Sequence, residues 1–85
     1  MSETRETILD LVCEQVGLDE DASKTLKARG RLDELTAVDS LLMVDLVISL
    51  EERFGIRFDP ADIDPELVGD ISRLADYVDK AVRES

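Results

Sequence analysis

Histidine and tryptophan are absent from this 85-residue sequence, which has one cysteine and two prolines. Without histidine, neither His-based acid–base catalysis nor a Ser-His-Asp triad can be assembled. The lone Cys13 excludes an internal disulfide and a cysteine-based metal site. No Gly-x-Ser-x-Gly segment and no phosphate-binding glycine loop occurs either. We therefore expect a protein that is not itself an enzyme.

Signals for metal binding and for membranes are also missing. The acidic run at 19–21 suggests a calcium loop, but an EF-hand aligned from Asp19 needs glycine where Lys24 stands and glutamate where Gly30 stands. We therefore expect no metal site. The sequence also has no apolar run long enough for a signal peptide or a membrane span. These absences predict a cytoplasmic protein with no membrane partner.

Acidic side chains dominate the charge of the chain. Asp and Glu number 21 against 10 Lys and Arg, which gives a net charge of −11. Residues 33–70 alone hold 11 acidic and two basic residues, a local net charge of −9. Such a surface repels nucleic acid and favours protein partners with basic patches. Four of the basic residues fall in one run, read as a solvated face that partly pairs with acids elsewhere: Lys24, Lys27, Arg29 and Arg31.

The apolar pattern predicts one all-α domain over residues 1–85, which we expect to be monomeric. A first helix is expected after a Ser2 cap and before Gly17. Its apolar face comprises Ile8, Leu9, Leu11, Val12 and Val16. Asp59-Pro60 is expected to start a turn at 60–63.

Two further helices are expected in the last third of the chain. Asp64-Pro65 starts a short third helix that Gly69 ends, and Ser72 caps a last helix. The last helix has an apolar stripe of Leu74, Ala75, Tyr77, Val78, Ala81 and Val82. Residues 18–38 show no sustained periodicity and are expected to form a long first loop. Leu26, Leu32 and Leu35 are expected to anchor that loop over the bundle. The prediction is a small four-helix bundle, with three longer helices and one short one.

The second helix, at 40–54, carries two apolar stripes. At about 100° per residue, the first stripe falls within the arc that a core-facing surface needs. It comprises Met43, Leu46, Val47, Leu50 and Phe54. Leu41, Val44 and Ile48 form the second stripe on nearly the opposite side, flanked by Asp45, Glu51 and Glu52. One side of this helix is therefore expected to build the core and the other to meet a partner.

Asp39 and Ser40 stand where this helix begins. Either side chain can accept a hydrogen bond from the free amides of the first turn, so either can serve as the N-cap. An ordinary Ser in this position is most often only a cap. Here Asp-Ser-Leu opens an acidic helix that ends in Leu-Glu-Glu-x-Phe-Gly, and this segment resembles the acyl carrier protein family over 39–58.

The resemblance implies a specific modification. In that family the serine of Asp-Ser-Leu is esterified with 4′-phosphopantetheine, whose thiol carries acyl groups as thioesters. Ser40 inherits this role. In the family, a phosphopantetheinyl transferase installs the arm from coenzyme A with magnesium, and the aspartate of Asp-Ser-Leu assists this step. The resemblance gives this role to Asp39. The docking positions would be the second stripe and its acids: Leu41, Val44, Asp45, Ile48, Glu51 and Glu52.

The resemblance also names the kinds of partner enzyme: acyl-activating enzymes, acyltransferases and synthases with basic docking surfaces. It leaves fatty acid, polyketide and related pathways open. The sequence departs from the pattern of fatty-acid carriers at Ala37-Val38 and Leu42-Met43, and its first loop is unusually basic at 24–31. The segment at 64–66 resembles stand-alone carriers that work with acyl- or aminoacyl-activating ligases. These features favour a dedicated, specialised pathway. Two alternatives stay open: an aminoacyl or peptidyl carrier of a nonribosomal type, and an unmodified helical interaction module.

Overall fold

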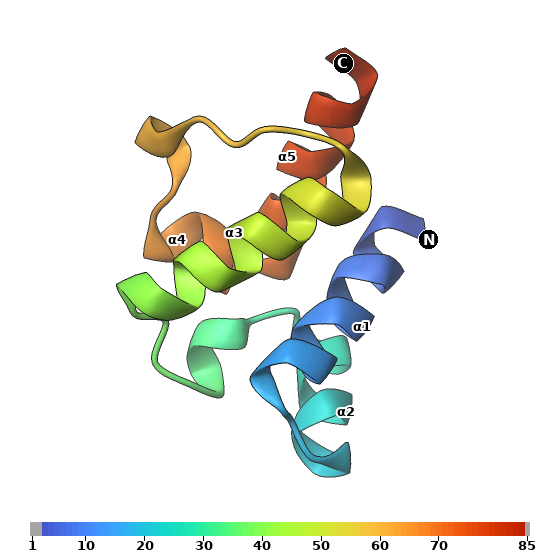
Figure 1. The fold of residues 1–85 in the computed structure, drawn as a ribbon. Helices are drawn as coiled ribbons and strands as arrows, with labels where there is room; N and C mark the ends of the chain where they lie inside the picture. Colours follow the sequence, from blue (N-terminus) through green and yellow to red (C-terminus); the bar gives the residue numbers. More distant parts are fainter. Residues whose placement is uncertain (1–2, 85) are drawn as a thin grey trace.

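Residues 3–84 are described by a computed structural model, in which five α-helices are joined by turns (Figure 1). The helices are α1 (Glu3–Val16), α2 (Glu20–Arg29), α3 (Ser40–Phe54), α4 (Pro65–Gly69) and α5 (Ile71–Glu84). Two 3₁₀ turns lie at Leu32–Glu34 and Pro60–Asp62. The all-α class is therefore confirmed. The expected Ser2 cap lies outside the described residues.

The count of four helices was wrong, because α2 occupies the middle of the expected first loop. The helix has no apolar stripe, since Leu26 is its only buried residue. Its ends stabilise it instead. The Asp19 side chain accepts a hydrogen bond from the amide of Ala22 at 2.8 Å, and Gly30 closes the helix at a φ of 70°. Acids in its first turn and bases in its last also complement the helix dipole.

Buried side chains from all five helices meet in one core. The fully or nearly fully buried members are Ile8, Leu9, Val12, Leu26, Leu32, Leu46, Val47, Leu50, Ile56, Phe58, Val68, Ile71, Leu74, Ala75 and Val78. The expected anchors of the first connection, Leu26 and Leu32, are completely buried, and Leu35 packs at the edge of the core. The helices therefore hold α3 across the middle of the molecule, with its ends on opposite sides (Figure 1).

Arg31 ties the segment before α3 to the start of α5. Its guanidinium makes two hydrogen bonds to the Asp33 carboxylate, at 2.7 and 3.1 Å, and lies 3.7 Å from Asp70. The amide of Ile71 donates to the carbonyl of Gly30 at 2.9 Å. The paired guanidinium lowers the pKa of Asp33, and the same carboxylate raises the pKa of Arg31. These contacts fix the chain that leads into α3.

The turn after α3 is held against α5 by Tyr77. Its ring stacks on Phe58 with centroids 4.8 Å apart. The hydroxyl accepts a hydrogen bond from the Asp59 amide at 3.1 Å and donates to Asp62 at 2.9 Å. Burial of the ring raises the pKa of Tyr77. The expected turn at 60–63 is present as the second 3₁₀ turn.

The cap of α5 differs from the sequence prediction. Asp70, and not Ser72, accepts hydrogen bonds from the first turn, at 3.0 Å from the Ser72 amide and 3.3 Å from the Arg73 amide. Ser72 is already inside the helix and is exposed. Aspartate and serine are both good N-caps, so the two adjacent candidates could not be ranked by residue type.

Candidate functional site

Ser40 is the first residue of α3, and Asp39 is its N-cap. The Asp39 carboxylate accepts a hydrogen bond from the Leu42 amide at 2.9 Å, and the Asp39 carbonyl accepts one from the Met43 amide at 3.0 Å. The cap is therefore Asp39, which settles the choice that the sequence left open. Ser40 is exposed, and within residues 3–84 its hydroxyl makes no hydrogen bond. Its oxygen is free to react.

The surroundings of Ser40 suit a phosphodiester. Within the described part of the chain, the amides of Ser40 and Leu41 have no hydrogen-bond acceptor. Free amides at the positive end of a 15-residue helix favour a negative group. A serine hydroxyl is also the group that such an ester requires. The residues present therefore fit an arm attached through phosphate, which Ser40 would hold.

The second stripe of α3 is exposed, as the sequence predicted. Leu41 is 71% exposed, Val44 49% and Ile48 47%. These are three of the four large hydrophobic side chains that are exposed among the described residues. Exposed apolar side chains that gather on one surface are typical of a partner-binding site, whereas single exposed ones are normal. We call Leu41, Val44 and Ile48 the docking stripe.

The opposite side of α3 builds the core, which confirms the assignment of the two stripes. Leu46, Val47 and Leu50 are buried. Met43 and Phe54 are partly buried and pack against the same cluster. The helix is thus fixed by one side, so the docking stripe is held in a defined orientation next to Ser40.

The three acids expected beside the docking stripe have different surroundings. Asp45 and Glu52 are exposed, and neither makes an ion pair within residues 3–84. Glu51 is half-buried and accepts a hydrogen bond from the Phe58 amide at 2.8 Å. Its carboxylate therefore also holds the turn after α3. The helical spacing of residues did not reveal this role, because Phe58 lies beyond the helix, seven residues after Glu51.

The basic run lies on α2 and the turn after it, where its side chains pair with nearby acids. Lys24 pairs with Glu20 and Lys27 with Asp10, both through exposed side chains. Arg29 pairs with Glu34, and Arg31 makes the contacts already described. This confirms the interpretation as a solvated, partly paired face. None of these residues lies on the exposed side of α3.

Added salt is expected to raise the melting temperature. Residues 33–70 carry a net charge of −9, and the pairs of the basic run neutralise only a few of their acids. Screening weakens repulsion between exposed charges over about 10 Å at 0.1 M salt. Thermal melts between low and physiological sodium chloride, and with millimolar magnesium, measure the effect. A flat or falling melting temperature would show that the basic run already compensates for the negative charge of residues 33–70.

Two further observations concern metal ions and membranes. Within 3–84 there is no group of three or more acidic or cysteine side chains placed to hold a metal ion. None of the helices in that range is long and apolar enough to cross a membrane.

An exposed serine on the first turn of an acidic helix, beside an exposed apolar stripe, is the arrangement expected of a carrier protein that bears a covalent arm. The model of a family described as "Phosphopantetheine attachment site" matches residues 6–78. The chain belongs to this acyl carrier protein family. Its cofactor is therefore covalently attached 4′-phosphopantetheine, and its role is that of a carrier. The unmodified interaction module is disfavoured accordingly.

Two relatives support the assignment over nearly the whole chain. An acyl carrier protein of Zymomonas mobilis is 35% identical over 80 residues, which is 94% of this chain and 96% of the relative. An acyl carrier protein of Thermotoga maritima is 33% identical over 73 residues, 86% of this chain and 84% of the relative. No solved structure gives a significant match.

Proposed function

We propose that Ser40 is the attachment residue and that the arm on it carries acyl groups between biosynthetic enzymes. The observation that carries the proposal is the exposed, unbonded hydroxyl of Ser40 on the first turn of α3. The family match supports the cofactor. Among the described serines, Ser40 alone combines the Asp-Ser-Leu segment with the docking stripe.

Each residue at the attachment point has a task in this proposal. The Ser40 oxygen would attack the coenzyme A phosphorus that bears the pantetheine, so that the pyrophosphate bond breaks, adenosine 3′,5′-bisphosphate leaves and the hydroxyl proton is released. The Asp39 carboxylate assists the transfer and at the same time caps the helix, since it is already fixed by the Leu42 amide. The amides of the first turn face the negative charge of the new ester. When bound, the arm supplies a terminal thiol, which holds acyl groups as thioesters.

In this proposal, partner enzymes bind the exposed side of α3. Basic enzyme surfaces are attracted by the exposed carboxylates of Asp45 and Glu52 and by the half-buried Glu51, which speeds encounter. The docking stripe then makes a small apolar contact that dissociates readily. Fast, weak binding is what a shuttle between several enzymes requires. The partners in this proposal are the transferase that installs the arm and the acyl-activating, acyltransferase or synthase enzymes that use it.

Acyl carrier proteins are carriers rather than enzymes, and we propose that this chain likewise catalyses nothing by itself. We also propose one monomeric domain over residues 1–85 that works in the cytoplasm. The names of the two relatives favour acyl cargo over aminoacyl cargo. Fatty acid synthesis is consistent with these names, and the sequence departures near Ser40 favour a dedicated pathway.

Intact-protein mass spectrometry tests the proposal. The chain is incubated with coenzyme A, magnesium and a phosphopantetheinyl transferase, and the modified peptide is then fragmented. The expected product gains one phosphopantetheine, located on Ser40. A product that carries the arm on another serine would overturn the assignment of the site. A chain that gains no mass with several transferases would overturn the carrier function.

A further inference from the structure

A hollow continues the docking stripe beyond the end of α3. It has a volume of about 380 Å³ and is lined by Ile48, Glu51, Glu52, Gly55, Ile56 and Arg57. Ile48 is the last residue of the docking stripe, so the hollow and the stripe form one continuous surface. Ser40 lies at the other end of the same helix, where α3 begins.

The lining of this hollow carries charges of both signs. Arg57 is exposed and, among the residues that the structure describes, forms no ion pair or hydrogen bond. Glu52 is exposed and equally unpaired within that range. The third charged group, Glu51, is directed to the Phe58 amide. The lining thus combines the half-exposed apolar side chain of Ile48 with one free carboxylate and one free guanidinium.

A basic residue of either kind is rare on this surface. Residues 33–70 contain only two basic residues against 11 acids, and Arg57 is one of them. A partner that is uniformly basic would be repelled at this point, whereas a partner with an acid opposite Arg57 would be attracted. Charges of both signs also fix how two surfaces are turned relative to each other, which apolar contacts alone do not.

We propose that this hollow sets the orientation of the phosphopantetheinyl transferase on α3. It receives an apolar side chain of the transferase, with a basic residue of that enzyme at Glu52 and an acidic one at Arg57. Ile48 lies eight residues from Ser40, about 12 Å along the helix axis. A standard interface covers about 800 Å² on each partner, which is wide enough to include both Ser40 and the hollow. The inference rests on the proposed function, since it concerns delivery of the arm to Ser40.

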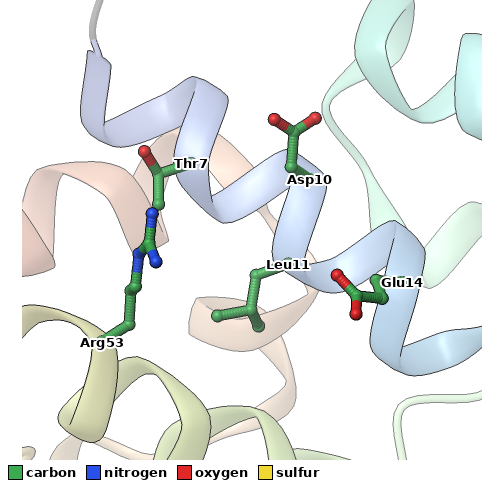
Figure 2. Close-up of a pocket in the computed structure, with 5 residues that line it drawn as sticks. All are labelled: Thr7, Asp10, Leu11, Glu14 and Arg53. Atoms are coloured by element: carbon green, nitrogen blue, oxygen red, sulfur yellow. The ribbon is translucent and has the colours of Figure 1, made fainter.

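The second basic residue of this region offers a matched control. Arg53 lies on the last turn of α3, about 140° around the helix from Ile48. Its side chain extends toward Thr7 on α1 (Figure 2). Thr7, Asp10, Leu11 and Glu14 line this separate pocket with Arg53. Within the described residues Arg53 also has no ion pair, so Arg53→Glu changes the charge as Arg57→Glu does, but away from the hollow.

The experiment measures kcat/KM for modification with coenzyme A by a transferase that modifies the parent chain. Arg57→Glu and Arg53→Glu both make the chain more acidic, so simple attraction to a basic enzyme raises both rates. The proposal instead expects Arg57→Glu to lower kcat/KM about three- to tenfold. This is the size of effect expected when an attractive pair of exposed charges is replaced by a repulsive one. Arg53→Glu is expected to match or exceed the parent. Thermal melts check that each variant is folded.

A double exchange, Glu52→Arg with Arg57→Glu, keeps the net charge at −11 and reverses the polarity of the hollow. We expect it to be modified about tenfold more slowly than the parent, a loss that overall charge cannot explain. Parental rates for the double exchange, or an equal change in Arg57→Glu and Arg53→Glu, would overturn the inference. A parent chain that is never modified would overturn the proposed function instead.

Discussion

Ser40→Ala is expected to abolish attachment of phosphopantetheine while leaving the free energy of unfolding nearly unchanged. Its hydroxyl is the only group at the start of α3 that the transferase can esterify. The cap, however, belongs to Asp39, and the Ser40 hydroxyl makes no hydrogen bond within the described residues. Alanine is also a better helix former than serine. The change in stability should therefore stay within about half a kcal/mol.

Three matched variants complete this test. Asp39→Ala removes the cap and is expected to cost about 1 kcal/mol, because the Leu42 amide loses its acceptor. It keeps the hydroxyl and should still be modified, more slowly than the parent. Ser49→Ala and Ser72→Ala remove other serines and are expected to be modified at parental rates. Mass spectrometry and thermal melts report on all four proteins. Modified Ser40→Ala protein would place the arm on another residue.

The sequence was sufficient where burial follows a periodic pattern. In α3 the spacing of apolar residues separated Leu46, Val47 and Leu50, which are buried, from Val44 and Ile48, which are exposed. The same kind of pattern located α1 and α5 and most of their buried residues. Val82 was wrongly placed on the apolar stripe of α5, since it lies near the end of the helix and is 43% exposed. Such patterns are reliable because a small core leaves little choice about which side of a helix is covered.

Prediction was insufficient where local hydrogen bonds decide the structure. A periodicity search did not find α2, because only Leu26 of that helix is buried. The signal lay in its ends: an aspartate cap, acids followed by bases, and a closing glycine. Glu51 and Asp70 illustrate the same limit, since their backbone contacts depend on how the chain turns. The hollow beside Arg57 likewise arises only when the turn after α3 folds back over the helix end.

Leu46→Ala and Leu50→Ala are expected to destabilise the fold far more than any change on the exposed side of α3. Both side chains are completely buried, so truncation loses apolar burial and leaves a cavity, at a cost of about 2–5 kcal/mol. Small domains have stabilities near 5 kcal/mol. Either variant should therefore be substantially unfolded at moderate temperature. Circular dichroism melts provide the measurement.

Val44→Arg and Ile48→Arg serve as the contrasting pair on the docking stripe. Because both side chains are about half exposed, arginine can extend into solvent, and stability should change by no more than about half a kcal/mol. Arm transfer and acyl loading should slow instead, since each variant loses an apolar contact and places a positive charge against a basic partner. Arginine variants that unfold while the alanine variants melt like the parent would mean that the two sides of α3 are exchanged. Arginine variants that fold and load at parental rates would place docking elsewhere, so that the carrier function would act through Ser40 without this stripe.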